Sequence, residues 1–531
     1  MASSGGMWSK VFLHGTWLTG VVLACSLAPF AVAHAQCPDG SLPPCRSAPS
    51  RPGPAGKNGV AVLYFDNLSR DSTYAYVADG LTEELILKLG SVSQLDVRSR
   101  FAVRRYRDQP PSDPAAVGRA LGVSYLVVGS VRPGNDRVRV TVEVVRATTG
   151  TRVWGRELDG SSADLLAVTD EVAQVVAQGI VGQLAPAEAA ALTSRATNNP
   201  EAYDHFLRGN FAMALRTPLA VLRALNEYQT ALRLDPAYTA ARARTAYAYA
   251  MLLGWGWPHP SLPAESVLAR GAAEADRALR QDSASSDAWM ARGMLLWFLE
   301  PRGLRGAPEA LERSVALDSG NAEAWNLLGV TDMMLGRDSA AEFVLRRALA
   351  IEPGRPISLM RLAEVRWLEH DYSEARRLLD SLIASAPGFY SAYADRVGIL
   401  LHAGDTAAAR RDADLCAQLG ADDYVTTRTV VAWVQAVEGD SVDARRGMDS
   451  VLALTAGPNG VRASVLPGVV MPFVALGDTT KALDIVEHSQ PRGPYLWLSL
   501  RWPMLEPLWG LARFQRVVDE SRAAVPSGAL H

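Results

Sequence analysis

The strongest constraint on this chain is a repeat of 34 residues in its C-terminal two-thirds. Equivalent hairpin ends recur at spacings of 47, 36, 34 and 34 residues, at Asp235-Pro236, Asp282-Ser283, Asp318-Ser319, Glu352-Pro353 and Ala386-Pro387. A second series repeats at 34, 34 and 35 residues and consists of Gly336, His370, Gly404 and Gly439. Self-similarity at this period predicts stacked units, each of which buries its apolar face against the next one. The longer first spacing predicts an insertion, which we place at residues 254–263.

The unit that begins at Ala322 shows the residue pattern of the repeat. The matching residues are Trp325, Leu328 and Gly329 on a first helix, and Ala341, Ala348 and the terminating Pro353 on a second. This pattern resembles the tetratricopeptide repeat, although Asp332 stands where that family has an aromatic residue. The resemblance implies an all-α solenoid over residues 200–525, with small residues where two helices cross closely. It also implies a final capping helix, which we expect from Pro503 to Arg516.

Residues 59–185 have a different pattern, in which strands and helices alternate. The apolar run at 60–65 predicts a buried strand, and residues 76–89 predict an amphipathic helix. Asp113 followed by Pro114 is typical of a helix start. Valines alternate with polar residues from 138 to 144, which predicts a strand with one wet face. We therefore expect an α/β (or α+β) N-terminal domain with a mixed sheet.

Sequence motifs in this region carry a second resemblance. They are Val60-Ala61-Val62-Leu63, Phe65-Asp66-Asn67-Leu68-Ser69, Ala78-Asp79-Gly80-Leu81-Thr82-Glu83-Glu84-Leu85, Leu121-Gly122-Val123, Tyr125-Leu126, Gly129-Ser130-Val131, Thr149-Gly150 and Trp154. Residues 59–183 resemble the TolB amino-terminal-like domain family, with Tyr64 at a position where the family has proline. The resemblance implies a periplasmic-type α/β module that often accompanies tetratricopeptide repeats. Because the role of that family is poorly defined, it implies an architecture rather than an activity.

The N-terminus predicts export. An apolar run from Thr16 to Ala33 ends in the small-x-small pattern that signal peptidase recognises, so residues 1–35 are interpreted as a signal peptide cleaved between Ala35 and Gln36. The alternatives are an uncleaved membrane anchor and a lipoprotein signal at Cys25. Residues 36–58 are rich in proline and glycine and predict an extended linker. The expected location is the periplasm or the exterior, with no stable membrane span after removal of the leader.

The sequence offers little chemistry. The eight histidines show no close ligand spacing, and the motifs of phosphate loops, nucleophile elbows and zinc proteases are missing. We therefore predict no catalytic residues, no cofactor and no metal. The one suggestive acidic set is Asp66, Asp79, Glu83 and Glu84, for which helix capping and surface roles are favoured. Cys416 lies at a small-residue position of its repeat, which indicates a core residue rather than a nucleophile.

Two classes of function remain after this search. The first is a non-catalytic scaffold that binds a protein or peptide partner through the groove of its helical repeats. The alternative is a periplasmic ligand-sensing or catalytic module with its site in the 59–185 domain. A net charge of −3 gives no argument for nucleic acid.

The repeat spacing aligns a set of candidate groove residues on successive first helices. They are Met290, Met294 and Trp297, then Asn326 and Met333, then Met360 and Trp367. Methionine adapts to varied apolar partners, and tryptophan adds contact area, so this set suits an apolar peptide or helix. The alternative is that the same side chains pack helix against helix inside the stack. Exposure separates the two interpretations, because groove residues keep exposed surface.

We expect Cys37 and Cys45 to be disulfide-bonded in the exported protein, because they lie close together behind an export signal. By the chain-entropy model, closing a loop this short stabilises its folded form by roughly 2–3 kcal/mol. Thiol labelling before and after reduction checks the bond. Two reactive thiols in this segment of freshly isolated, unreduced protein would exclude it.

Overall fold

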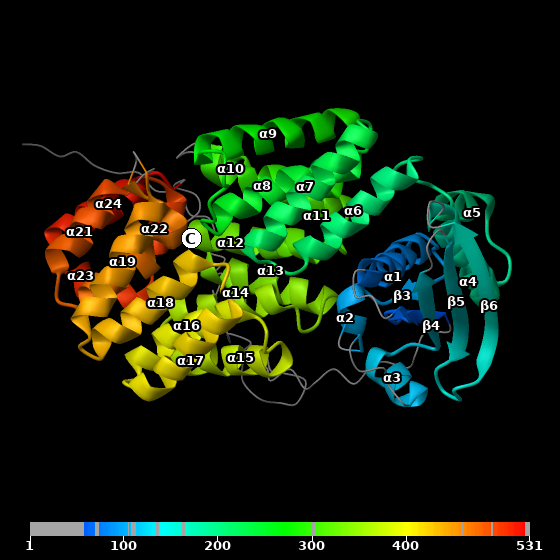
Figure 1. The fold of residues 1–531 in the computed structure, drawn as a ribbon, viewed down its shortest axis with the longest axis horizontal. Helices are drawn as coiled ribbons and strands as arrows, with labels where there is room; N and C mark the ends of the chain where they lie inside the picture. The colour runs from blue at the N-terminus through cyan, green and yellow to red at the C-terminus, as the bar shows by residue number, and fades with distance from the viewer. Residues whose placement is uncertain are drawn as a thin grey trace, which may run out of the picture. The chain divides into compact units, whose positions relative to one another are not determined.

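The computed structural model describes residues 58–69, 74–104, 106–107, 113–133, 137–161, 165–299, 303–457, 460–489 and 492–525. The predicted signal peptide, almost all of the linker, the Ala35–Gln36 cleavage site, and Cys37 and Cys45 lie outside these residues. The described part begins with an α/β unit and continues as a solenoid of helices (Figure 1).

The α/β unit is built on a mixed sheet, as the sequence predicts. Its strands are β1 (Gly59–Val62), β2 (Asp66–Asn67), β3 (Asp96–Val97), β4 (Tyr125–Pro133), β5 (Arg137–Arg146) and β6 (Arg152–Ser161). Their order is β3-β1-β4-β5-β6, with β2 paired to β4. Strand β1 pairs in parallel with β3 and β4, β2 pairs in parallel with β4, and β4, β5 and β6 pair antiparallel. The helices are α1 (Ala75–Gly90), α2 (Arg100–Arg104), α3 (Pro114–Leu121), α4 (Leu165–Val181) and α5 (Pro186–Leu192).

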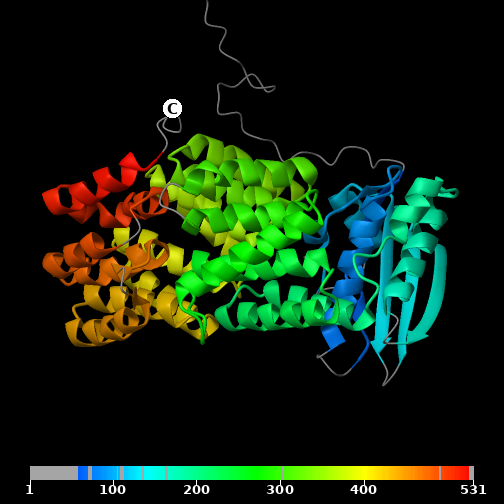
Figure 2. The ribbon, with the colours of Figure 1, turned by 90° about the horizontal axis from the view of Figure 1, so that it is seen from above.

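Strand β5 shows how the sequence pattern builds this sheet. Val138, Val140, Val142 and Val144 are buried, whereas their polar neighbours lie on the other face. The buried valines share a core with side chains of α1 and α4, which cover this face of the sheet (Figure 2). A smaller apolar cluster lies on the other face, between β1, β4, α2 and α3. Sheet and helices therefore bury a core on both sides, as expected for such a layered unit.

The core of the α/β unit continues beyond residue 185. Leu192, at the end of α5, is fully buried in it together with Tyr203 and Leu207 of the next helix. The ammonium group of Lys88 is buried below the same segment and donates to the carbonyls of Leu192 at 2.9 Å and Ser194 at 3.0 Å. These contacts fasten the connection between the two parts of the chain to the sheet domain.

From α6 to α21 the described chain is a series of antiparallel helical hairpins. The helices are α6 (Pro200–Met213), α7 (Pro218–Leu234), α8 (Thr239–Gly254), α9 (Ala264–Gln281), α10 (Ser286–Leu299), α11 (Ala307–Leu317), α12 (Ala322–Met334), α13 (Asp338–Ile351), α14 (Pro356–Leu368), α15 (Tyr372–Ser385), α16 (Tyr390–His402), α17 (Thr406–Leu419), α18 (Tyr424–Val437), α19 (Ser441–Thr455), α20 (Leu466–Ala475) and α21 (Thr479–His488). The first helix of each hairpin carries an even number, and the second an odd number. The structure is thus an all-α solenoid of the tetratricopeptide type, as predicted.

The second repeat series of the sequence marks the turns inside the hairpins. Gly336, Gly404 and Gly439 have φ of 71°, 75° and 89° there. This left-handed conformation is strained for residues with a Cβ and free for glycine. His370 takes the same place with φ of 62°, so the repeat keeps the conformation even where glycine is missing.

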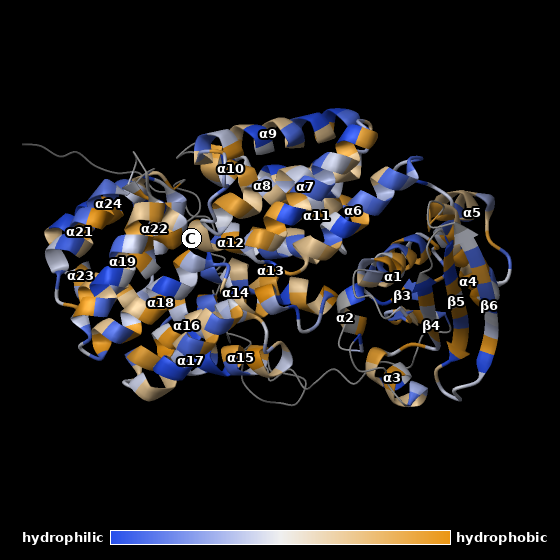
Figure 3. Ribbon diagram, viewed as in Figure 1, coloured by the Kyte–Doolittle hydropathy of each residue, from blue (hydrophilic) through white to orange (hydrophobic). Residues whose placement is uncertain are grey.

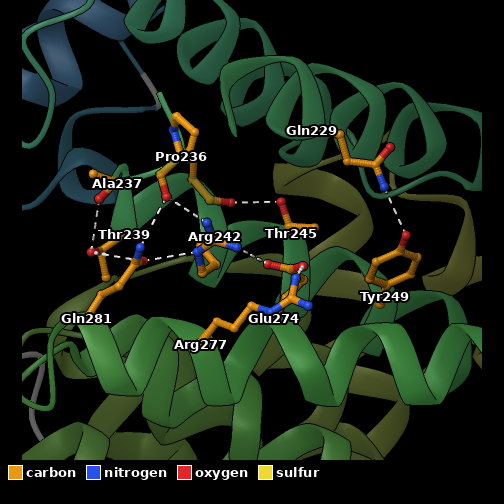
Figure 4. Close-up of polar contacts among 11 residues, drawn as sticks. Gln229, Pro236, Ala237, Thr239, Arg242, Thr245, Tyr249, Glu274, Arg277 and Gln281 are labelled. Atoms are coloured by element: carbon orange, nitrogen blue, oxygen red, sulfur yellow. Dashed lines mark hydrogen bonds and ion pairs between the residues drawn. The ribbon is translucent and has the colours of Figure 1, made fainter. Parts of the chain in front are cut away.

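The first repeat series marks the ends of the second helices. Asp235, Asp282 and Asp318 each follow such a helix in extended conformation. Figure 4 shows the polar contacts at one of these ends, where Arg242 of α8 donates to the carbonyl of Pro236 at 2.7 Å and to Glu274 of α9 at 2.5 Å. Such contacts fix the register of neighbouring helices.

The 254–263 insertion lies where the spacing places it, between α8 and α9. Trp255 and Trp257 stack there with ring centroids 5.3 Å apart. The hydropathy colouring in Figure 3 shows α9, which follows the insertion, largely hydrophilic on its visible face. No helix among the described residues is both long and apolar enough to cross a bilayer.

The C-terminal end differs from the expected single helix at 503–516. It consists of α22 (Pro494–Leu500), the 3-10 turn η5 (Pro503–Leu505), the short α23 (Glu506–Trp509) and α24 (Ala512–Ala523). Pro503 has no backbone N–H to donate, so the helix is interrupted there. A second interruption of the helix follows at Gly510 and Leu511. Earlier in the chain, two strands of two residues each, β7 (Ala456–Gly457) and β8 (Gly460–Val461), pair antiparallel.

A fragment that ends at residue 185 should be less stable than one that ends at residue 198. The shorter fragment loses Leu192 from its core and leaves Lys88 without the two carbonyls that accept its hydrogen bonds. Loss of one buried leucine side chain alone costs about 2–5 kcal/mol. Urea denaturation of fragments 58–185 and 58–198, followed by circular dichroism, measures the difference. Equal midpoints would mean that the sheet domain is complete at residue 185.

Candidate functional site on the inner face of the repeats

The first helices of the hairpins form what we call the inner face of the solenoid. The seven predicted groove residues lie on α10, α12 and α14 of this face, at equivalent positions, as the spacing predicts. However, all seven are buried, with exposures of 0–7% for Met290, Met294, Trp297, Asn326, Met333, Met360 and Trp367. The expectation that they keep exposed surface is therefore not met. Their contact with a partner stays a prediction, but an open groove at these positions is not present.

The chain's own C-terminal segment covers several of these residues. Tyr495 of α22 lies edge-on to Trp297, with ring centroids 6.3 Å apart, and Trp502 lies edge-on to Trp367 at 5.0 Å. Arg501 donates to the carbonyl of Met333 at 3.1 Å. Residues 494–502, which we call the inner strap, thus occupy the place that an apolar peptide was expected to take.

The inner strap is held at several points. Arg501 pairs with Asp338 at the start of α13, and its guanidinium lies 4.8 Å from the ring centroid of Trp497. The hydroxyl of Tyr495 donates to the carbonyl of Gly254 at 3.0 Å. Trp497 and Trp502 both lie against the inner face.

A buried carboxylate joins the insertion to the later hairpins. Asp423 caps α18 and accepts a hydrogen bond from Trp257 at 2.9 Å and another from Tyr390 at 2.8 Å. Arg462 donates to the carbonyl of Gly256 at 2.6 Å, and the backbone N–H of Leu219 donates to Asp422 at 3.2 Å. Early and late hairpins are therefore in direct contact across the inner face.

A cavity of about 100 Å³ remains between the inner face and the inner strap. Its apolar lining comes mainly from Met251, Trp255, Met294, Trp297, Met333, Leu498 and Trp502. Its polar lining comes from Arg216, Tyr247, Glu323, Asn326, Arg361, Glu364, Ser464, Tyr495 and Ser499. Most of this polar set could not be recognised from the sequence, because its members come from separate parts of the chain and form no local motif.

One wall of the cavity is a buried ion-pair network. Arg216 and Arg355 both pair with Glu323, and Arg355 also pairs with Glu352. Burial alone would raise the pKa of Glu323, but the two guanidinium groups outweigh burial and hold that pKa at about 2. Glu323 is therefore ionised at any physiological pH, and its ion pairs hold this wall of the cavity in place.

A second wall carries Arg361 and Glu364, and Asp395 lies behind them, outside the lining of the cavity. Nη1 of Arg361 donates to both oxygens of Glu364, at 2.6 and 2.7 Å. Burial, and then the neighbouring charge of Glu364, raise the pKa of Asp395 well above its ordinary value. Asp395 thus holds a proton more readily than an ordinary carboxyl.

The other residues that the sequence analysis singled out do not form a site. Asp79 pairs with Arg107 at 2.5 Å, Glu83 pairs with Arg100 at 2.9 Å, and neither carboxylate caps a helix. The capping role that was favoured for these two residues is therefore wrong. In the part of the chain that the structure describes, no three or more histidine, cysteine, aspartate or glutamate side chains could hold a metal ion.

Asp66 and Glu84, the other members of the acidic set, have different surroundings. Asp66 is exposed on β2, whereas burial raises the pKa of Glu84 beside Lys88. Cys416 is fully buried, and burial raises the pKa of its thiol to about 12. The interpretation of Cys416 as a small core residue is confirmed, because a thiol with that pKa is a poor nucleophile at neutral pH.

Comparison with curated proteins finds a relative that matches part of the chain. The chain is 35% identical over 201 residues to a protein of Rhizobium meliloti (strain 1021) named "Putative adenylate cyclase 3". This match covers 38% of the chain and spans about a third, 34%, of the relative's length. No protein-family profile matches the chain.

Solved structures of repeat proteins are also similar to parts of the chain. A thermophilic TPR protein of Thermus thermophilus is 18% identical with a TM-score of 0.32, and the match covers 38% of this chain and 99% of that one. A tetratricopeptide repeat protein of Parabacteroides merdae ATCC 43184 is 12% identical with a TM-score of 0.35, covering 51% and 99%. Yeast Tom70 is 12% identical with a TM-score of 0.37, covering 68% and 79%. The hairpin geometry described above already defines this chain as a helical-repeat protein of the tetratricopeptide type.

Truncation of the inner-face tryptophans should cost stability. Trp297→Ala and Trp367→Ala each remove a buried aromatic side chain, which costs about 3–5 kcal/mol. Phe343→Ala is the control, because Phe343 is 71% exposed and its removal should change stability by less than about 0.5 kcal/mol. Chemical denaturation of the full chain measures all three. Tryptophan variants as stable as the control would restore the open-groove interpretation.

Proposed function

We propose that this chain is an exported, non-catalytic scaffold that binds a protein or peptide partner through its helical repeats. The observation that carries the proposal is the stack of helical hairpins from α6 to α21. Stacked repeats offer an extended surface whose neighbouring units present equivalent side chains, and this suits elongated partners.

The inner face is the proposed binding surface, and the inner strap is the competitor that a partner replaces. The contacts of the strap indicate what the face accepts, namely aromatic rings against Trp297 and Trp367 and a guanidinium near Asp338. A peptide with aromatic and arginine side chains at similar spacing would satisfy the same groups. Burying aromatic surface provides the affinity, and the buried charge pair provides the orientation.

We propose further that the α/β unit is a TolB amino-terminal-like domain. The motif glycines support this, because they stand where the packing leaves no room for a side chain. A Cβ on Gly129 would lie 2.4 Å from the carbonyl oxygen of Thr141 and 2.5 Å from the ring of Phe65. A Cβ on Gly80 would lie 2.9 Å from Leu207, which belongs to the first helix of the solenoid.

The proposed location is the periplasm or the exterior, on the strength of the predicted leader. N-terminal sequencing of the exported chain tests this, with Gln36 as the expected first residue. The alternative function is a ligand-sensing or catalytic module in the α/β unit; the partial match to a protein named "Putative adenylate cyclase 3" supports a catalytic role without assigning it to that unit. The paired state of Asp79 and Glu83 favours the scaffold over that alternative.

Weakening the inner strap should increase partner capture. Arg501→Ala removes the pair with Asp338 and the hydrogen bond to Met333, so the strap leaves the inner face more readily. The matched control is Arg492→Ala, which removes an arginine that pairs with Glu520 just before the strap. Affinity capture from an envelope fraction, with a photo-crosslinking residue at position 333, measures both variants and the unchanged chain. Crosslinks that rise in Arg501→Ala alone support the proposal.

Two results would contradict the proposal. If the amount of crosslinked partner is the same in the unchanged chain and in both variants, the inner face is not the binding surface. Partner that is captured through the α/β unit alone would favour the alternative function.

A further inference from the structure

The cavity under the inner strap has unused hydrogen-bonding capacity. Nε of Arg361 and Oγ of Ser464 are buried, and neither makes a hydrogen bond with a described residue. Both residues line the cavity, although Arg361 comes from α14 and Ser464 from the turn before α20. A buried donor without a partner costs about 1–3 kcal/mol, so two of them at one cavity point to a ligand that supplies acceptors.

Arg361 presents a defined edge to such a ligand. Its Nη1 is taken by Glu364, and its guanidinium lies 5.6 Å from the ring centroid of Trp255. These two contacts hold the plane of the group, and its Nε–Nη2 edge has no hydrogen bond to the described residues. That edge is the one that pairs side by side with two coplanar oxygens, or with the oxygen of an amide.

Asn326 adds a further polar group to the same space. It is 2% exposed and accepts a hydrogen bond from Ser358 at 3.2 Å through its carbonyl oxygen. With that oxygen engaged, its amide nitrogen is the part of the side chain that remains for a ligand. The charged groups of the lining balance, since Arg216 and Arg361 face Glu323 and Glu364. The cavity therefore offers unused hydrogen-bond donors, and it carries no net charge.

Size and apolar surface restrict the ligand further. A cavity of about 100 Å³ is smaller than the engineered cavity of roughly 150 Å³ that binds benzene. It therefore suits a molecule of about four to six non-hydrogen atoms. Trp255, Trp297 and Trp502 give the rest of the wall an apolar, aromatic character. A short alkyl group fits beside them.

We propose that this cavity binds a compact organic molecule with a carboxyl-type head group, either a carboxylate or a primary carboxamide, on a short alkyl body. The head group accepts from the Nε–Nη2 edge of Arg361 and from Ser464, and the alkyl body contacts the tryptophans. Because the inner strap forms one side of the cavity, the bound molecule holds the strap against the inner face. The evidence for this site does not rest on the protein partner proposed above, but a molecule that holds the strap in place opposes the access of that partner.

Three probes of five non-hydrogen atoms test the head group on the full chain. Propionate and propionamide carry it with and without charge, and 1-butanol lacks it. Isothermal titration calorimetry and thermal unfolding at matched ionic strength should show binding and a raised Tm for propionate, propionamide or both, and neither effect for 1-butanol. 3-Phenylpropionate, which exceeds the cavity, should bind more weakly than the best small probe. The propionate and propionamide arms decide which head group the site prefers.

Variants separate this site from unspecific binding. Arg361→Lys keeps the charge beside Glu364 but removes the planar edge, and should weaken binding by at least about tenfold. Ser464→Ala removes one donor and should weaken binding several-fold. Ser499→Ala is the control, because Ser499 lines the same cavity but donates to the carbonyl of Ala463 at 2.7 Å, so affinity should stay unchanged.

The proposal is overturned if neither propionate nor propionamide binds, or if 1-butanol binds as well as they do. Equal affinity in Ser464→Ala and Ser499→Ala would overturn it as well, even if Arg361→Lys fails to fold.

Discussion

The structure of the repeats depends on the closure of their inner face by the chain itself. Tetratricopeptide-type hairpins present large apolar side chains on their first helices, and water disfavours that surface. Burying one such side chain contributes roughly 1.5–3 kcal/mol, so an inner face of several methionines and tryptophans needs a cover. The inner strap supplies it through Tyr495 and Trp502, and the 254–263 insertion contributes Trp255 and Trp257.

Buried polar groups decide where this cover sits. Apolar contact alone is non-directional and would permit many positions of the strap. Asp423 accepts from both Trp257 and Tyr390, and an unpaired carboxylate at that depth would be costly, so the insertion has one favourable place. The pairing of Glu323 with Arg216 and Arg355 acts in the same way, because removal of one partner from a buried pair costs about 3–5 kcal/mol.

Local features of this fold could be predicted from the sequence, whereas the closure could not. The 34-residue period identified the hairpin ends and a second series of equivalent positions, which the structure shows to be left-handed turns, including His370, because both depend on neighbouring residues. The alternating valines of β5 identified its buried face for the same reason. The burial of Trp297 and Trp367 depends on a segment more than a hundred residues further along the chain, and no spacing encodes that return. The cluster of tryptophans from Trp497 to Trp509 was the available signal, since aromatic residues near a chain end need a surface to cover.

Closure also changes how a repeat protein responds to binding. In an open solenoid each hairpin contacts its neighbours only, and stability is close to a sum of local terms. Here the hydroxyl of Tyr495 reaches Gly254, and Arg462 reaches Gly256, across 241 and 206 residues of sequence. Such contacts join distant hairpins into one cooperative unit, so opening at the strap removes support from the insertion as well. A molecule that contacts both α14 and the strap side of the cavity adds its binding free energy to that whole unit by mass action, rather than to a single hairpin. The inner face is therefore the place where ligand binding, partner access and stability are coupled in this chain.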